Sequence, residues 1–201
     1  KGYLESKKDP KGDLVRAILF YEDLLRDKKS AKEDKEIALK FLVHMIGDVH
    51  QPLHVGTKND MGANKVWVKW FDESTNLHKL WDEGLIEFQK LSYTEYVSFI
   101  DKIGESQQRD WNKTSLLDWV EESRIISDKL HEGLRVYKKH RLSYTYNYEY
   151  LELLNERLKQ AGVRLAFFLN NIFDGRKNVD SDKIRETLGS EPNYGLPGRS
   201  K

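Results

Sequence analysis

The sequence contains no cysteine, which excludes disulfide bonds and thiolate zinc sites within its 201 residues. It has no apolar run that approaches the roughly 18 residues of a membrane-spanning helix. It also has little net charge, because 34 lysines and arginines nearly balance 33 aspartates and glutamates. This balance excludes a global positive field that would attract polyanions. A nucleic-acid partner would therefore need local positive charge, such as bound metal ions provide.

The periodicity of apolar residues indicates a mostly helical chain. Residues 65–71 alternate like a strand and give the one clear β signal. We therefore predict an all-α, multi-helix domain with one short β-hairpin over residues 1–173. A polar, loosely held tail is expected over residues 174–201. Ser30 is the expected N-cap of the second helix. The predicted helices cover residues 14–27, 30–49, 76–89, 93–107, 114–137 and 148–173.

Histidine and aspartate recur in this sequence at helical spacing. His44 and Asp48 are four residues apart, as are His78 and Asp82, and His54 follows soon after the first pair. A residue and its fourth neighbour share one face of a helix, so an imidazole and a carboxylate can converge on one ion. The apolar stripe of the second helix continues through His44 and Asp48, which predicts that this pair is buried. A buried ionisable pair is costly unless it is bonded or holds a metal.

Each of these residues also has an interpretation without metal, as a core histidine, a loop histidine or a solvated helix pair. All of those interpretations would have to hold at once, although the sequence has only six histidines. Mixed imidazole and carboxylate ligands favour zinc over calcium. We interpret His50 as a turn histidine bonded to backbone, and His131 and His140 as surface residues without partners. Trp67 and Trp70 are expected in the core.

The segment His44-Met-Ile-Gly-Asp-Val-His-Gln-Pro-Leu-His54 resembles the signature of the zinc-dependent single-strand-specific nucleases. This family includes fungal nucleases, mung bean nuclease and plant bifunctional nucleases, and it shares a superfamily with zinc-dependent phospholipase C. The resemblance spans about residues 12–173. It continues through Gly62-Ala-Asn64, Asn76-Leu-His-Lys-Leu-Trp-Asp82, Trp119-Val-Glu-Glu-Ser123 and Leu158-Lys-Gln-Ala-Gly-Val-Arg-Leu-Ala166.

The resemblance implies a phospholipase C/nuclease-like helical fold around three zinc ions. By this analogy His44 binds the first zinc, and Asp48 bridges it to a close neighbour. His54, His78 and Asp82 hold the more distant zinc. The implied activity is hydrolysis of single-stranded DNA and RNA by metal-activated water. The enzyme would be an endonuclease, with 3'-nucleotidase activity as a further expectation.

The loop that follows the signature is implied to contact substrate, through Gly62, Asn64 and Lys65. The family motif there is Gly-Gly-Asn, whereas this chain has Ala63 at the second position. Alanine resists some conformations that glycine permits, so this loop is expected to approach a nucleotide less closely. Two alternatives stay open: a zinc-dependent phospholipase C, and a non-catalytic zinc-stabilised binding domain.

Family members begin with a Trp whose amino group and carbonyl bind zinc, followed by a His, an Asp and another His. None of these four can be placed here, and the sequence starts at Lys1 without a signal peptide. We therefore expect the domain over residues 1–173 to lack its N-terminal segment. It would hold one complete zinc triad and half of a bridged pair. By family resemblance we expect a monomer that is secreted or periplasmic.

Overall fold

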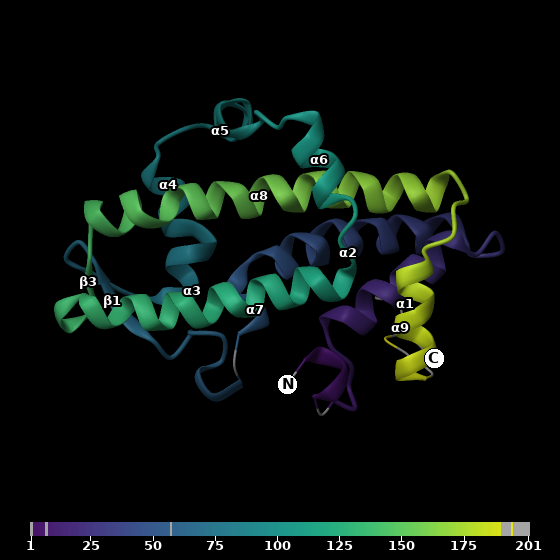
Figure 1. Cartoon of the computed structure of the whole chain (residues 1–201), viewed down its shortest axis with the longest axis horizontal. Helices are drawn as coiled ribbons and strands as arrows, with labels where there is room; N and C mark the ends of the chain where they lie inside the picture. Colours follow the sequence, from purple (N-terminus) through teal and green to yellow (C-terminus); the bar gives the residue numbers. More distant parts are fainter. Residues whose placement is uncertain (1, 7, 57, 190–193, 195–201) are drawn as a thin grey trace.

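The computed structural model describes residues 2–6, 8–56, 58–189 and 194, and helices dominate it (Figure 1). The predicted all-α class with one short β-hairpin is confirmed. None of the helices among the described residues combines the length and the apolarity needed to cross a membrane. The helices are α1 (Leu14–Arg26), α2 (Lys32–His50), α3 (Leu77–Lys79), α4 (Leu85–Phe88), α5 (Tyr93–Ile100), α6 (Glu105–Trp111), α7 (Leu116–Gly133), α8 (Tyr144–Phe173) and α9 (Val179–Leu188).

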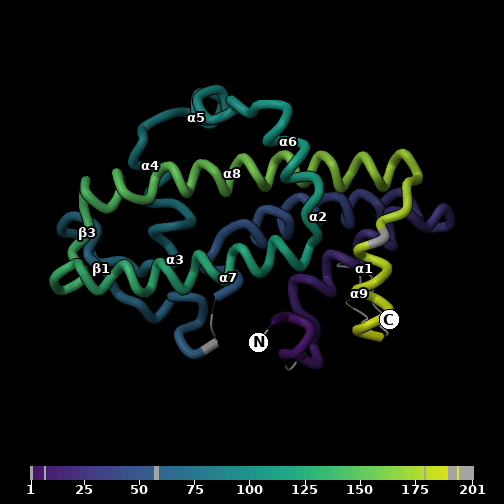
Figure 2. Tube along the Cα trace, in the orientation of Figure 1, coloured from purple at the N-terminus to yellow at the C-terminus, as the bar shows by residue number. Residues whose placement is uncertain are grey.

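The long helices α2, α7 and α8 run alongside one another and form the body of the molecule (Figure 2). One apolar core lies where α1 and α2 meet α7 and the second half of α8. Its buried residues include Ile18, Leu42, Ile46, Trp119 and Phe168. Burial of such side chains stabilises by about 1.5–3 kcal/mol each, which is enough to fix how these helices pack.

A second apolar core lies beneath a small sheet, next to α3, the end of α7 and the start of α8. At its centre the indole N–H of Trp81 donates a hydrogen bond to the Tyr146 hydroxyl at 2.9 Å. Both side chains are buried, so this bond satisfies polar atoms that would otherwise be costly. The core anchors the segment that carries His78 and Asp82.

The sheet has three short strands, β1 (Trp67–Trp70), β2 (Glu73–Asn76) and β3 (Arg141–Leu142), in the order β2-β1-β3. β1 and β2 form the predicted antiparallel hairpin, with Lys69 opposite Ser74. β3 adds to the other edge of β1 in parallel, with Lys69 beside Arg141. A strand of two residues has no periodicity to read, which is why the sequence did not reveal β3.

Several local predictions were wrong. The helix expected over residues 93–107 is two helices, because α5 ends at Ile100 and α6 begins at Glu105. Ser30 does not cap α2: Ala31 is the N-cap residue, and it makes no side-chain cap bond. Trp67, expected in the core, is 67% exposed, whereas Trp70 packs partly buried against the second core as expected.

The predicted buried stripe of α2 was also wrong. The buried face of α2 carries Ala38, Leu42, Ile46 and Val49, which pack in the first core. The His44 side chain is 72% exposed. Burial therefore does not favour metal binding at His44. Only the geometry of the neighbouring side chains supports a metal site there.

Residues 179–188, inside the stretch expected to be loosely held, form α9. Ile184 is buried in the first core. The Arg185 guanidinium bonds to the fully buried Glu22 carboxylate at 3.0 Å and to the Leu19 carbonyl at 3.1 Å. These contacts tie α9 to α1. Residues 190–193 and 195–201 of the predicted tail lie outside the described residues.

Candidate metal centre

The end of α2, a 3-10 turn and the helical segment that begins with α3 supply the predicted ligands. His44 and Asp48 lie on the last turns of α2, which ends at His50 before Pro52. Proline disfavours helix at the residue before it, and the Gln51 side chain accepts a bond from the Leu53 N–H at 2.6 Å. The chain then turns through a 3-10 segment, Pro52–Val55, that carries His54.

His78 lies in α3, and Asp82 lies in a π-helical turn, Leu80–Gly84, that joins α3 to α4. Asn76 caps α3 by accepting a bond from the Lys79 N–H at 2.8 Å. Single π turns inside helices are often found at functional sites. The sequence spacing predicted the helix but not this widened turn.

The five predicted ligands lie in one continuous line of contacts, which runs His44, Asp48, His54, Asp82, His78. The Asp48 carboxylate lies 3.3 Å from His44 Nε2 and 3.5 Å from His54 Nδ1. The Asp82 carboxylate lies 3.1 Å from His54 Nε2 and 3.2 Å from His78 Nε2. Residues from three separate elements therefore converge, as their spacing predicted.

His54, His78 and Asp82 form the tightest part of this line. Each offers one ligand atom, and these atoms all lie within 4.8 Å of one another. The two imidazole rings stack with their centroids 4.8 Å apart. Two imidazoles and one carboxylate are the three-ligand pattern that leaves open positions on a zinc-type ion. The group could therefore hold a metal ion.

Neighbouring polar groups fix the orientation of two of these side chains. His78 Nδ1 lies 2.7 Å from the Gly62 carbonyl, which can only accept, so His78 Nδ1 carries the proton. A neutral His78 would then offer its Nε2, which lies 3.2 Å from the Asp82 carboxylate, to an ion. The Gln51 amide donates to Asp82 Oδ1 at 2.6 Å. Such outer contacts are typical of metal ligands.

The charges at the centre suit a cation. Bonds from Asp48 and then from Asp82 raise the pKa of His54 to about 9, against the opposing effect of burial. Burial raises the pKa of Asp82, but the bonds from His54 and Gln51 outweigh it and hold that pKa below its ordinary value. In this arrangement a protonated imidazole balances two carboxylates, and a divalent cation would compete with that proton.

Of the three predicted substrate residues, only Gly62 contacts a predicted ligand in the part of the chain that the structure describes. Gly62 has φ +62°, and a Cβ there would lie 2.3 Å from the Leu53 carbonyl oxygen, so glycine is required. Ala63 also has a positive φ, 65°, and is fully buried. Asn64 and Lys65 are exposed, and Asn64 donates to the Met61 carbonyl at 3.0 Å.

His131 was expected on the surface without a partner, and that was wrong. His131 Nε2 lies 2.6 Å from Asp60 Oδ2, and His131 Nδ1 lies 2.7 Å from the Ser127 carbonyl on α7. Asp60 Oδ1 in turn accepts from the Ala63 N–H at 3.0 Å. This pair ties the loop that orients His78 to α7. The two residues are 71 positions apart, so no local signal could have shown it.

A buried polar network supports the end of α2 behind the centre, and its members are too far apart in the sequence to be predicted from it. The Glu122 carboxylate on α7 accepts from Arg157 at 2.8 Å and from Arg164 at 2.7 and 2.8 Å. Arg157 also donates to the His50 carbonyl at 3.1 Å. Ser123 donates to the Val49 carbonyl at 2.5 Å. Hydrogen bonds from α7 and α8 therefore hold the last residues of α2, the helix that carries Asp48.

The expected backbone bond of His50 is confirmed, since its Nδ1 lies 2.7 Å from the Ile46 carbonyl, but His50 is the last residue of α2 and not a turn residue. Its Nε2 also lies 3.0 Å from Arg164 Nη1. Burial, and then the nearby Arg157, lower the pKa of His50 to about 3. His50 is therefore neutral in the folded protein. His140 is exposed, as expected, but its Nδ1 lies 3.2 Å from the Trp67 carbonyl.

A cavity of about 330 Å³ borders the centre. Four of the five predicted ligands face it, together with apolar side chains and the buried Arg157. Its lining includes His44, Asp48, His54, Asp82, Ile86 and Leu158. A recess of this size with one apolar wall and one polar wall is typical of a small-molecule or nucleotide site.

Comparison with known proteins gives a family match. The sequence profile of the S1/P1 Nuclease family matches residues 2–174. Endonuclease 3 of Arabidopsis thaliana is 32% identical over 158 residues, which cover 71% of this chain and 53% of that protein. Endonuclease 2 of the same plant is 30% identical over 195 residues, 85% of this chain and 67% of that protein. Nuclease S1 of Aspergillus oryzae is 30% identical over 182 residues, 80% of this chain and 62% of that protein. The chain thus spans about half to two thirds of the length of these relatives.

Proposed function

The chain belongs to the S1/P1 nuclease family, as its motifs indicated, and from that membership we propose that it acts as a zinc-dependent phosphodiesterase. Its substrates would be single-stranded DNA and RNA, and as an endonuclease it would cut them at internal phosphodiester bonds. The relatives are named as endonucleases and nucleases, which supports this reaction class. The observation that carries the proposal is the group of His54, His78 and Asp82 with ligand atoms within 4.8 Å.

Zinc is the ion that best fits these residues. The donors are imidazole nitrogen and carboxylate oxygen, and the chain has no cysteine. By analogy with the family, His54, His78 and Asp82 would hold one zinc. Asp48 would bridge a closely spaced pair, with His44 as a ligand of one member. We propose three ions for the intact protein.

Bound zinc supplies a water of lowered pKa, about 7, as the nucleophile at neutral pH. The residues of the chain hold and orient the reacting groups. Gly62 and Gln51 fix the ligand side chains through the Gly62 carbonyl and the Gln51 amide. The exposed Asn64 and Lys65, next to Gly62, would contact the substrate phosphate and sugar.

The cavity beside the centre supports a single-stranded substrate. Its apolar wall includes Trp81, Ile86 and Leu158, which can receive an unstacked base. In a duplex the bases are stacked and paired, so they cannot enter a recess without the cost of flipping. An unpaired strand meets no such cost.

A pair of neighbouring substitutions tests the proposal. Asp82→Asn removes the carboxylate that touches both His54 and His78, so it should reduce bound zinc and abolish cleavage of circular single-stranded DNA. The control is Glu83→Gln, since Glu83 pairs with Lys79 on the solvent side of the same turn. Zinc content by elemental analysis and cleavage should both be retained in the control.

Equal zinc content and equal activity in the two variants would contradict the assignment. His78→Ala gives a second test, because it should also prevent zinc from binding at His54, His78 and Asp82. Wild-type protein that cleaves phosphatidylcholine but no nucleic acid would instead indicate a phospholipase C. Zinc bound without any hydrolysis would indicate a metal-stabilised binding domain.

We further propose that the protein is a monomer and acts outside the cytoplasm, in a secreted or periplasmic location. The support for the location is membership of the S1/P1 nuclease family, whose members we expect to be exported. Sedimentation of the purified protein tests the first point, and fractionation of the source cells tests the second.

A further inference from the structure

The sheet presents one face to solvent. Along β1 the side chains alternate, so that Val68 is 3% exposed while Trp67 is 67% exposed and Lys69 is also exposed. Lys69 lies opposite Ser74 on β2 and beside Arg141 on β3, and both of these are exposed. Trp67, Lys69, Ser74 and Arg141 are called the outer sheet face below.

Two side chains of the outer sheet face, Lys69 and Arg141, are cationic. Arg141 forms an ion pair with Asp72. In the part of the chain that the structure describes, Lys69 and Lys139 form no ion pair. Lys139 lies just before β3, where it and His140 both have a positive φ, 54° and 49°. Non-glycine residues rarely adopt this conformation, and it turns the Lys138–His140 segment back toward β1, where His140 lies 3.2 Å from the Trp67 carbonyl.

The outer sheet face adjoins the candidate metal centre. Trp67 lies opposite Asn76, the residue that caps α3, and His78 is two residues further on. The Leu77 N–H donates to the Val66 carbonyl at 2.9 Å, which holds the start of β1 against α3. Lys65, which immediately precedes Val66, is also exposed. A strand whose phosphate reached the centre could therefore continue along β1.

We propose that the outer sheet face, together with the exposed Lys139 just before β3, binds the unpaired nucleic-acid strand that flanks the phosphate to be cut. Trp67 stacks on one base, and Lys69 and Lys139 bind backbone phosphates. Exposed aromatic side chains between basic ones are how proteins bind single strands without sequence preference. The chain as a whole carries a net charge of only +1, so this attraction is local. The proposal rests on the proposed nuclease function and specifies how a long substrate is held.

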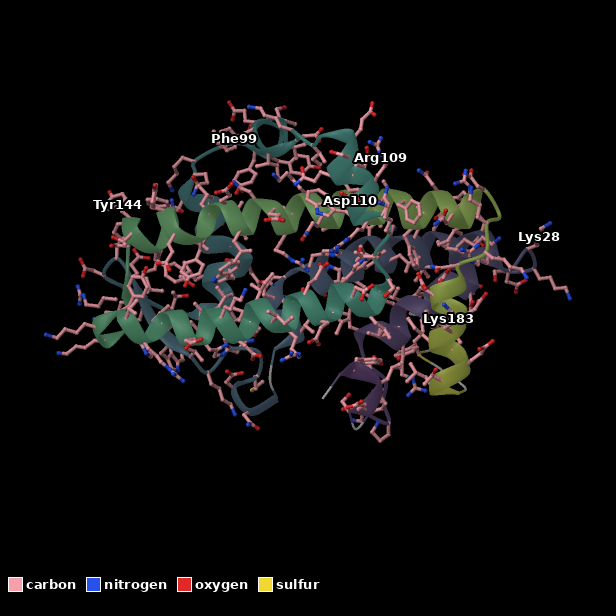
Figure 3. The ribbon with its side chains drawn as sticks, viewed as in Figure 1. Lys28, Phe99, Arg109, Asp110, Tyr144 and Lys183 are labelled. Atoms are coloured by element: carbon pink, nitrogen blue, oxygen red, sulfur yellow. The ribbon has the colours of Figure 1, made fainter. Side chains whose placement is uncertain are left out.

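The molecule offers matched controls at its far end. Phe173 is 66% exposed at the last residue of α8, whereas the sheet lies beside the first residues of α8 (Figure 1). Lys28 is an exposed lysine at the end of the molecule opposite the sheet (Figure 3). Trp67→Ala is therefore paired with Phe173→Ala, and Lys69→Gln with Lys28→Gln.

Binding of a fluorescent phosphorothioate dodecathymidylate by zinc-loaded protein, followed by anisotropy, tests the proposal without turnover. We expect Trp67→Ala to weaken binding about tenfold, as loss of one stacked base does. Lys69→Gln should reduce the slope of log affinity against log salt by about 0.7, which corresponds to one phosphate contact. Neither control variant should change affinity or slope. Unchanged binding in both Trp67→Ala and Lys69→Gln would overturn the proposal.

Cleavage assays then distinguish a defect in the outer sheet face from a defect in the metal centre. Trp67→Ala should raise KM for a dodecamer about tenfold and leave cleavage of a dinucleotide unchanged, because a dinucleotide has no flanking nucleotides for the outer sheet face to bind. An equal loss on both substrates would overturn the proposal, since it would place Trp67 in the centre or in the fold. A wild-type dimer that Trp67→Ala converts to monomer would also overturn it, by making the face a subunit contact. Because anisotropy needs no hydrolysis, failure of the nuclease assignment would be seen separately.

Discussion

Glu122→Gln is the substitution whose consequence the structure defines most sharply. Glu122 lies on α7, and its carboxylate accepts three hydrogen bonds from two guanidinium groups of α8. The Arg157 and Arg164 side chains are only 4% and 1% exposed. Burial raises the pKa of Glu122, but the bonds from Arg164 and Arg157 outweigh it and keep the pKa below its ordinary value. The carboxylate is therefore ionised, and glutamine would remove its charge with little change of shape.

The expected cost follows from the two buried cations. Removal of one partner of a buried ion pair costs about 3–5 kcal/mol, because the remaining charge has no counter-ion and little water. The Glu122 side chain is itself 33% exposed, so water can reach part of the site, and we expect the lower value, about 3 kcal/mol. For a chain of this size that corresponds to a fall in Tm of about 6–12 °C.

The assay is urea unfolding followed by circular dichroism, once with a chelator and once with zinc, because a bound ion adds its own stabilisation. The control is Glu121→Gln. Glu121 is the preceding residue of α7 and pairs with Arg124 at the surface, where both side chains are more than 40% exposed. Loss of that exposed pair should cost less than about 1 kcal/mol.

The same network holds the end of α2, through the Val49 and His50 carbonyls, directly after Asp48. Glu122→Gln should therefore also weaken zinc binding, which Glu121→Gln should not. If Glu122→Gln lowered the free energy of unfolding no more than Glu121→Gln does, the view that Glu122 neutralises the buried arginines would be refuted.

Three further predictions concern the loop, its support and pH. Gly62→Ala should cost more than about 2 kcal/mol and reduce bound zinc, because its Cβ would lie 2.3 Å from a backbone oxygen and its φ is positive. Gly47→Ala, in a helix with nothing within 4 Å of the new Cβ, should instead stabilise by about 0.5–1 kcal/mol. His131→Ala removes the partner of Asp60, and the free energy of zinc binding should fall at least as much as the free energy of unfolding. His131→Gln can still donate to Asp60 and should recover part of the zinc affinity. Equal zinc affinity in the wild type and both variants would contradict this. The buried His50, with its pKa lowered from 6.5 to about 3, stays neutral while the unfolded chain takes up a proton. Stability should therefore fall as pH drops from 6.5 toward 3, by up to about 1.4 kcal/mol per unit from this group, and unfolding of His50→Gln should show a flatter slope.

The sequence predicted the helical class and a set of side chains that the structure brings together at the candidate centre. His44 with Asp48 and His78 with Asp82 share a helix face by spacing alone, and Gln51-Pro52 forced the turn that presents His54. These are local effects of backbone geometry, so they can be read from neighbouring residues. The motifs indicated the S1/P1 nuclease family by the same local route, and the family match confirms that membership.

The tertiary structure decided what depends on distant residues. The helix face of α2 that turns inward is the one that fits α1 and α8, which is why Ala38 and Leu42 are buried and His44 is not. The Asp60–His131 pair joins residues 71 positions apart, so no pattern within a short segment could predict it.

The same distinction applies to the groups that surround the site. Spacing fixed which side chains could meet a metal ion, because periodicity is a property of the chain itself. The exposure of Trp67, the charges around Glu122 and the carbonyl that orients His78 depend on which surfaces pack together. Packing depends on all of the side chains together, because the tertiary neighbours of a residue decide whether it is buried and which polar group it pairs with.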